Sequence, residues 1–310
     1  MKITHLSYQQ TIKFQRRFIR MSKIVVFGGS GFMGSHVADA LSNESHEVII
    51  FDSEPSEYIK ENQSQFLGSL EDLDAVKNVI SGSDVVYNFA ALSDLNEAMD
   101  RPIEVTKSNI LGNCNILEGC RLNSVKRFIY ASSVYVNSRE GGFYGVSKKS
   151  AELFVEEYLR AFGLEFTILR YGSLYGPRSN NKNGLRKIIS DAIQNNSLTY
   201  NGNKDAIREY IHVRDAARAS VKAMEKKYKN KKLILTGHQP IKVMDLLKML
   251  SEMMNFPKKS INFINEEYKG HYIQTPYHHD PDLAQKYIPD TFIDLGEGLL
   301  ELIQECSKQK

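Results

Sequence analysis

The 310-residue sequence has little cysteine and no long apolar run. Its cysteines are Cys114, Cys120 and Cys306, and none of them forms a Cys-x-x-Cys pair. This spacing indicates neither a disulfide framework nor a thiolate metal site, and it suits a reducing compartment, so we expect a cytoplasmic protein. No apolar run approaches the ~18 residues that a membrane-spanning helix needs, and we expect no membrane association.

The sequence also lacks a strong excess of charge of either sign. It has 40 lysines and arginines against 37 aspartates and glutamates, which gives a net charge of +3. This balance provides no electrostatic basis for binding nucleic acid. The hydrophobic fraction of 42% and the charged fraction of 25% are ordinary for a globular protein.

The segment before the second methionine, Met21, lacks acidic side chains and the apolar stretch of a secretory signal. It is basic and rich in arginine towards its end. Such a segment resembles either a transit peptide or, as we favour, a disordered extension or an early start codon. We therefore expect the folded part of the chain to begin at Ser22.

Apolar runs and amphipathic segments alternate in the first half of the chain. The runs typical of buried strands are 23–29, 46–52, 66–70, 83–91, 126–133 and 165–173. The segments with helical spacing are 35–43, 73–81, 102–123 and 145–162. This alternation predicts an α/β fold of right-handed βαβ units with a Rossmann-type, doubly wound parallel sheet.

The alternation ends near residue 174, and a stretch rich in Pro, Gly and Asn follows at 175–184. We predict a first domain over 22–174 and a smaller, mixed α/β C-terminal domain over 175–310. The segment 213–237 reads as a helix and a strand that return to the sheet of the first domain.

Three glycines, Gly28, Gly31 and Gly34, stand between the first predicted strand and the first predicted helix. Glycine allows a tight turn and lets the backbone approach a pyrophosphate, which the helix N-terminus can bind. Asp52 ends the second predicted strand, where a carboxylate accepts hydrogen bonds from a ribose diol and repels a 2′-phosphate. The pattern favours NAD over NADP; the alternative is a merely tight strand–helix turn.

Tyr144 and Lys148 are four residues apart near the start of a predicted helix, and so lie on one face of it. A free tyrosine has a pKa of about 10, but a nearby ammonium favours the phenolate. Beside a cofactor, the pair can remove a hydroxyl proton while hydride leaves the same carbon. Ser133, at the end of the preceding strand, can hydrogen-bond the same substrate oxygen. By itself, Tyr-x-x-x-Lys is common on ordinary helices.

Several motifs occur in order along the chain. They are GGSGFMG (28–34), FD (51–52), NFAA (88–91), NILGNCNILE (109–118), YASSVYV (130–136), YGVSK (144–148), LRYGSLYGPR (169–178) and REYIHVRDAARA (208–219). In these motifs the sequence resembles the extended short-chain dehydrogenase/reductase family, in its nucleotide-sugar epimerase/dehydratase branch, of the UDP-glucose 4-epimerase kind. The resemblance covers residues 23 to about 300.

The resemblance implies roles for individual residues. It makes Tyr144 the acid/base, Lys148 its partner and a ligand of the nicotinamide ribose, and Ser133 the third catalytic residue. The implied NAD-binding residues, besides Tyr144 and Lys148, are Gly28, Gly31, Phe32, Met33, Gly34, Asp52, Ser69, Leu70, Asn88, Ala90, Ala91 and Tyr171. The implied substrate-binding residues are Ser133, Ser173, Asn183 and Arg208, of which Arg208 would hold the nucleotide diphosphate of the sugar.

The sequence departs from the family pattern at three places. Ser69 stands where an adenine-binding aspartate is usual, and Ser173 stands where many members have asparagine. Val134 and Tyr135 follow Ser133 in place of the acidic pair with which 4,6-dehydratases eliminate water. The last departure argues against a dehydratase.

The resemblance also implies an assembly and a domain assignment. Helices 102–122 and 145–162 would form a four-helix homodimer interface. Residues 22–174 would bind NAD and residues 175–310 the nucleotide sugar. The stretch YHHDPD (277–282) contains adjacent histidines, which point in opposite directions in an extended chain, so we expect no metal site there.

The favoured function is an NAD-dependent epimerase of a nucleotide-diphosphate sugar that passes through a 4-keto intermediate after transient oxidation at C4. An NAD-dependent reductase or dehydrogenase, or a dehydratase, of a nucleotide sugar is the nearest alternative. A non-catalytic NAD-sensing regulator on the same fold is the third.

Overall fold

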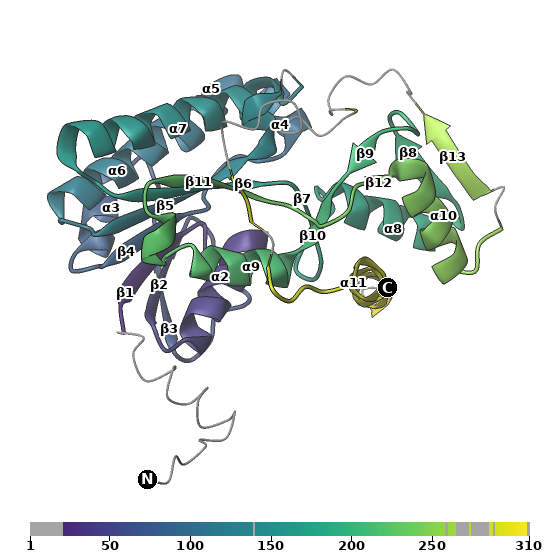
Figure 1. Cartoon of the computed structure of the whole chain (residues 1–310), viewed down its shortest axis with the longest axis horizontal. Helices are drawn as coiled ribbons and strands as arrows, with labels where there is room; N and C mark the ends of the chain where they lie inside the picture. Colours follow the sequence, from purple (N-terminus) through teal and green to yellow (C-terminus); the bar gives the residue numbers. More distant parts are fainter. Residues whose placement is uncertain are drawn as a thin grey trace, which may run out of the picture.

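The computed structural model describes residues 21–138, 140–257, 260–264, 273, 285–287 and 289–308. Its larger lobe is built on an eight-stranded sheet with the strand order β14-β11-β6-β5-β4-β1-β2-β3, in which each recorded pairing of described strands is parallel (Figure 1). The strands are β1 (Lys23–Phe27), β2 (Glu47–Asp52), β3 (Gln63–Leu67), β4 (Val85–Asn88), β5 (Arg127–Ser133), β6 (Phe166–Tyr171), β11 (Lys231–Leu235) and β14 (Gln285–Lys286). The predicted Rossmann-type fold is confirmed.

Helices cover both faces of this sheet. One face packs on α2 (Phe32–Asn43) and α9 (Val213–Lys222), and the other on α3 (Leu73–Ile80), α6 (Gly112–Leu122) and α7 (Gly142–Phe162). Alternate residues of each strand enter opposite cores: Ile24 and Val26 face α2, while Val25 and Phe27 face the other side. Because both faces are buried, the central strands are apolar almost without interruption.

Two predicted elements differ from the structure. The third strand, predicted at 66–70, is β3 at Gln63–Leu67, because the chain leaves the sheet at Gly68, which lies directly against the ring of Phe51. The predicted helix 102–123 is three pieces: α5 (Pro102–Val105), a π-helical stretch (Thr106–Leu111) and α6. A π-helical stretch inserts an extra residue into a helix and is frequent at functional sites.

A smaller lobe packs beside the C-terminal ends of the strands of the sheet (Figure 1). Its helices are α8 (Gly184–Asn195), α10 (Val243–Met253) and α11 (Leu295–Lys308), and its strand pairs are β8 (Leu198–Asn201) with β13 (Ile261–Ile264), and β9 (Ile207–Arg208) with β12 (Ile241–Lys242). The strands β7 (Ser173–Tyr175) and β10 (Tyr210–His212) pair in parallel between the lobes. The lobe has its own apolar core, which includes Leu185, Leu246 and Leu302.

Among the residues that the structure describes, no helix is long and apolar enough to cross a lipid bilayer. The basic N-terminal segment (1–20) and the stretch 277–282, which carries the adjacent histidines, lie outside the described residues.

Candidate active site

The glycine turn between β1 and α2 lies where the strand order reverses, since β2 and β4 flank β1 on opposite sides. Gly28 has a φ of 74°, and a Cβ there would lie 2.5 Å from the backbone nitrogen of Ala90. A Cβ on Gly34 would lie 2.1 Å from the carbonyl oxygen of Gly28. Side chains are therefore excluded at both positions, and the turn presses against the end of β4.

The N-terminus of α2 is suited to an anion. Gly31 is its N-cap, and no described side chain caps this helix end. The first turn begins with Phe32 and Met33 and carries no acidic residue. Its backbone N–H groups and the positive end of the helix dipole can bind a pyrophosphate at close range, so the turn fits a dinucleotide.

Asp52 closes one side of the same turn. Its Oδ2 atom accepts a hydrogen bond from the backbone nitrogen of Ser30 at 2.9 Å, which ties the end of β2 to the glycine turn. Ser69 and Leu70 lie just beyond β3; Ser69 is exposed, and Leu70 packs against Gly112 of α6. The structure thus places Asp52 at the turn itself, with Ser69 and Leu70 after the neighbouring strand.

The end of β4 forms the opposite side of the turn. The Oδ1 atom of Asn88 accepts from the backbone nitrogen of Ala90 at 3.0 Å, and its Nδ2 atom donates to Asn113 of α6 at 2.9 Å. Asn88 is buried, whereas Ala90 and Ala91 are partly exposed. These bonds fix the bend after β4 that brings the backbone of Ala90 against Gly28.

The three predicted catalytic residues come together at the end of β5. Ser133 is the last residue of β5, and its side chain forms a hydrogen bond with Tyr144, in the first turn of α7. Lys148 is 3% exposed; its Nζ atom donates to the carbonyl oxygen of Ala131 at 2.8 Å and lies 5.9 Å from the ring centre of Tyr144. The predicted spacing on one helix face is thus realised, with Lys148 buried and Tyr144 partly exposed.

Burial opposes the charged form of both partners. It raises the pKa of Tyr144 to about 12, although the hydrogen bond from Ser133 acts in the opposite direction. It lowers the pKa of Lys148 to about 7, and the charge of Glu152 acts against that fall. A phenolate and an ammonium this close stabilise one another, so ionisation of the tyrosine depends on the lysine remaining charged.

The predicted substrate-binding residues other than Ser133 lie on the side of the smaller lobe. Arg208 of β9 is 7% exposed and donates to the carbonyl oxygen of Ile207 at 2.8 Å and towards the hydroxyl of Tyr200 at 3.4 Å. Asn183 caps α8, because its Oδ1 atom accepts from the backbone nitrogen of Arg186 at 3.1 Å. Ser173 begins β7 and is partly exposed.

Tyr171, predicted to bind the cofactor, ends β6 in the core. Its hydroxyl lies 2.6 Å from the Oγ atom of Ser220 on α9, and its ring packs against Phe89. Burial raises the pKa of this hydroxyl well above its ordinary value. The hydroxyl therefore has a partner in the interior of the protein.

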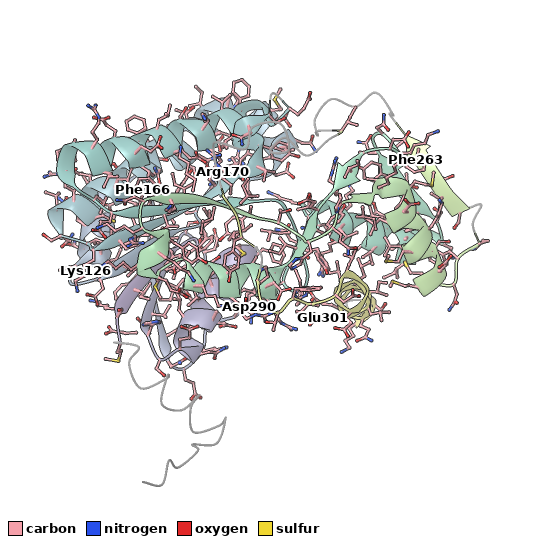
Figure 2. The ribbon with its side chains drawn as sticks, viewed as in Figure 1. Lys126, Phe166, Arg170, Phe263, Asp290 and Glu301 are labelled. Atoms are coloured by element: carbon pink, nitrogen blue, oxygen red, sulfur yellow. The ribbon has the colours of Figure 1, made fainter. Side chains whose placement is uncertain are left out.

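Three buried polar residues beside the predicted catalytic face were not predicted from the sequence. Asn109, in the π-helical stretch, bonds both backbone polar groups of Leu92 and donates to the Oγ atom of Ser147 at 2.9 Å. Glu152 and Arg170 form a buried ion pair, and Figure 2 labels Arg170 in the larger lobe. An arginine inside the apolar run of β6 was a signal, since a buried charge requires a partner.

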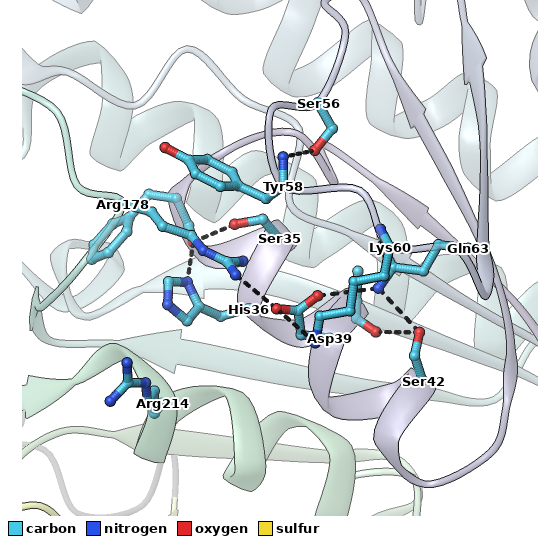
Figure 3. Close-up of polar contacts among 12 residues, drawn as sticks. Ser35, His36, Asp39, Ser42, Ser56, Tyr58, Lys60, Gln63, Arg178 and Arg214 are labelled. Atoms are coloured by element: carbon cyan, nitrogen blue, oxygen red, sulfur yellow. Dashed lines mark hydrogen bonds and ion pairs between the residues drawn. The ribbon is translucent and has the colours of Figure 1, made fainter.

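A second polar cluster joins the lobes near α2 (Figure 3). Arg178, after β7, donates to Asp39 of α2 at 2.8 Å, and its guanidinium carbon lies 4.5 Å from the ring centre of Tyr58. His36 lies beside this pair, and burial lowers its pKa to about 4. The cluster ties the segment leading to the smaller lobe to α2 and to the loop after β2.

Comparison with known proteins connects this geometry to a family. A putative UDP-glucose 4-epimerase of Methanocaldococcus jannaschii is 27% identical over 302 residues, which span 90% of this chain and 97% of that protein. A UDP-N-acetyl-alpha-D-glucosaminuronate decarboxylase of Bacillus cytotoxicus is 25% identical over 315 residues, with 91% of this chain and 97% of that protein covered.

Solved structures of nucleotide-sugar epimerases are also similar to this chain. The UDP-glucose 4-epimerase of Thermotoga maritima, with UDP-glucose, is 27% identical and superposes with a TM-score of 0.79 over 93% of this chain and 99% of that one. The UDP-glucuronic acid 4-epimerase of Bacillus cereus, in complex with UDP-glucuronic acid and NAD, has a TM-score of 0.81 over 93% of this chain and 100% of that one. At 23% identity, the second likeness shows the shared fold.

The family model described as the NAD dependent epimerase/dehydratase family matches residues 24–235, which run from β1 to the end of β11. That match confirms the resemblance inferred from the motifs, and with it NAD as the cofactor. This chain is an enzyme that belongs to the NAD dependent epimerase/dehydratase family.

Proposed function

We propose that the protein is an NAD-dependent epimerase that inverts C4 of a nucleotide-diphosphate sugar. The observation that carries the proposal is the meeting of Ser133, Tyr144 and Lys148 at the end of β5, in the lobe that carries the glycine turn. The same edge of a doubly wound sheet is where such folds bind ligands.

Each of the three side chains has its own role in the transfer of the hydroxyl proton. The phenolate of Tyr144 accepts the proton of the 4-hydroxyl group and later returns it, while Ser133 hydrogen-bonds the same oxygen. Lys148 remains charged beside the tyrosine and stabilises the phenolate. NAD, held at the glycine turn beside Asp52, would supply the acceptor and donor for the C4 hydride. Inversion requires the 4-keto sugar to turn over before hydride returns to its other face.

The residues after Ser133 favour epimerisation over dehydration. Val134 is buried, and the ring of Tyr135 packs edge-on against the ring of Tyr144 at 6.4 Å between centres. Elimination of water at C5–C6 needs an acid and a base beside the catalytic tyrosine. Val134 has no ionisable group, and Tyr135 carries a phenol in place of a carboxylate. A reductase or dehydrogenase of a nucleotide sugar remains the second candidate, because it uses the same three side chains.

For the substrate, we propose that residues 175–310 bind the nucleotide sugar and residues 22–174 bind NAD. Arg208 has the chemistry to hold a diphosphate, since a guanidinium binds phosphate oxygens in a bidentate manner. Ser173 and Asn183 complete the proposed set. The relative from Methanocaldococcus jannaschii is a putative UDP-glucose 4-epimerase, so a UDP-hexose is the first substrate to test.

We further propose a homodimer through helices α5 to α7. Apolar side chains that are more than two-fifths exposed gather on this layer: Ile103, Leu111, Leu122, Phe143, Val146, Leu153, Phe154 and Phe162. Large exposed apolar patches on soluble proteins mark interaction surfaces. A second copy would cover them by a self-complementary contact around a two-fold axis.

The test is incubation of the purified protein and NAD with UDP- and GDP-hexoses, followed by chromatography of the sugars. The expected result is interconversion of a pair of C4 epimers with no net NADH. Accumulation of NADH in proportion to product would instead identify a dehydrogenase. Loss of water, seen as a mass decrease in the product, would identify a dehydratase.

A further inference from the structure

The catalytic face of α7 continues one turn beyond Lys148 to a carboxylate that the proposed reaction does not use. Glu152 is 1% exposed and follows Lys148 by four residues, as Lys148 follows Tyr144. Residues at this spacing lie in one row on a helix. Because aspartate and glutamate are rarely buried to this extent without a partner, the surroundings of Glu152 are informative.

Three consecutive residues of β5 hold this row. The carbonyl oxygen of Ala131 accepts from the catalytic lysine at 2.8 Å, and the Oγ atom of Ser132 donates to the Oε1 atom of Glu152 at 2.5 Å. Ser133 then bonds the catalytic tyrosine. Glu152 therefore holds Ser132 in place. Ser132 lies between Ala131, which bonds Lys148, and Ser133, which bonds Tyr144.

Cations surround Glu152 on its other side. Arg170 is the register partner of Ser132 across β5 and β6, and it is fully buried. Its Nε and Nη2 atoms donate to the two carboxylate oxygens at 2.9 Å and 2.7 Å, which is a bidentate pair. The Nζ atom of Lys232, from β11, lies 3.8 Å from the Oε2 atom. These contacts keep a negative charge in place inside the protein.

That charge acts on the catalytic lysine. Burial lowers the pKa of Lys148, and the coulombic attraction of Glu152 raises it. The other groups that face Lys148 are aromatic: the ring of Tyr130 on β5, at 4.9 Å, and that of Tyr144. From α6, Cys114 faces Tyr130, and burial raises the pKa of its thiol, which is therefore neutral. Glu152 is thus the carboxylate that, within the described structure, supports the ammonium.

We propose that Glu152 is a positioning residue of this enzyme, which keeps Lys148 charged and in place beside Tyr144 and anchors β5 through Ser132. Arg170 holds the carboxylate in the required orientation. The expected change in the pH profile rests on the proposed function. The expected change in the ionisation of Tyr144 does not, because that ionisation can be followed without turnover.

The decisive measurement is the ionisation midpoint of Tyr144 in the NAD-bound protein, obtained from the phenolate absorbance of the wild type minus that of Tyr144→Phe. In Glu152→Gln, measured against Glu152→Gln/Tyr144→Phe, the midpoint should rise by about one pH unit or more, because Lys148 loses the negative charge that supports its ammonium and so stabilises the phenolate less. The pH profile of kcat/KM should narrow: the midpoint of its acid limb should move to higher pH, and that of its alkaline limb to lower pH.

Glu152→Gln leaves Arg170 buried without its counter-charge and can unfold the protein. The double variant Glu152→Gln/Arg170→Met removes both charges and avoids this penalty, and it should show the same direction of change. Glu156→Gln is the matched control: Glu156 lies one turn further along α7, is partly exposed and pairs with Lys232 at 2.7 Å. It should leave both midpoint and profile unchanged.

A folded double variant with the wild-type midpoint and pH profile would overturn the proposal and make the ion pair purely structural. If the midpoint rises although no sugar is turned over by the wild type, the positioning role stands and the proposed epimerase function fails. If sugars are turned over but the midpoint does not move, the proposed epimerase function stands and the positioning role fails.

Discussion

The proposed cofactor-binding end and the proposed catalytic end of the larger lobe differ in the physical factor that limits substitution. At the glycine turn, lack of space restricts which side chains fit, since a Cβ on Gly34 would lie 2.1 Å from the carbonyl oxygen of Gly28. At the β5–α7 face the limit is charge, because burial raises the pKa of Tyr144 to about 12 and lowers that of Lys148 to about 7. A steric limit is independent of pH and an electrostatic one is not, so substitutions can separate the two ends.

Tyr144→Phe should have the largest effect and should leave the cofactor end intact. Removing a general acid/base lowers kcat by roughly 10²- to 10⁴-fold. The recorded hydrogen-bond partner of the hydroxyl is Ser133 and not the glycine turn, so the Kd for NAD should change far less than kcat. Steady-state kinetics and NAD titration check this. A large loss of NAD affinity would show that the two ends are not separate.

Gly34→Ala should damage the cofactor end. The added methyl group cannot fit against the carbonyl of Gly28 without movement of the turn, and overpacking of this kind costs about 1–3 kcal/mol. NAD affinity should fall by about tenfold or more, by the same factor at pH 6 and at pH 9. The control is Gly184→Ala at the start of α8, where a Cβ would meet nothing within 4 Å.

The contrast also explains which features the sequence could predict. Gly28, Gly31 and Gly34 could be read directly, because a tight turn requires glycine whatever surrounds it. The break in the helix over 106–111 could not be read, because Asn109 is held by Leu92 and Ser147, which are distant in sequence. The alternation of apolar runs predicted the sheet, but the exit of the chain at Gly68 depends on the ring of Phe51.

Lys148→Met should change stability with pH. An unfolded lysine has a pKa of about 10.4. Since the folded pKa is lowered to about 7, the unfolded chain binds the proton more tightly between these values. The lysine therefore destabilises the fold most at pH 7 and below, and this penalty disappears as the pH rises towards 10.

The NAD-free Lys148→Met protein should therefore melt a few degrees above wild type at pH 7, although it is inactive. Loss of the bond to the carbonyl of Ala131 offsets part of the gain. The difference in Tm should shrink between pH 7 and pH 10. Lys149→Met, at the next position and partly exposed, should show no such trend. A constant difference across this range would contradict the assigned direction of the lysine pKa.

The proposed catalytic residues could be predicted from the sequence, but the charged residues that support them could not. Tyr144 and Lys148 share a helix, so their spacing alone puts them together. Glu152 and Arg170 come from α7 and β6 and meet because β5 and β6 pair in one register. The arginine inside an apolar strand indicated a buried partner, but several carboxylates in the sequence could have filled that role.

Asn183→Ala should have the smallest effect. It tests whether Asn183 in the smaller lobe only caps α8 or also binds the nucleotide sugar. Both ends of the Asn183 amide already have partners: Oδ1 accepts from Arg186 in the cap of α8, and Nδ2 donates to the carbonyl oxygen of Leu174 at 2.8 Å. Loss of an N-cap costs about 1 kcal/mol, or a decrease in Tm of about 2–4 °C.

Asn183→Ser retains a capping oxygen and should recover most of that stability. If Asn183 only caps the helix, KM for the nucleotide sugar follows stability and is restored in the serine variant. If Asn183 also binds the sugar, as the family resemblance implied, KM rises several-fold in both variants while Tm differs between them. Because serine is too short to take over a contact beyond the cap, the pair of variants separates a role in the fold from a role in recognition.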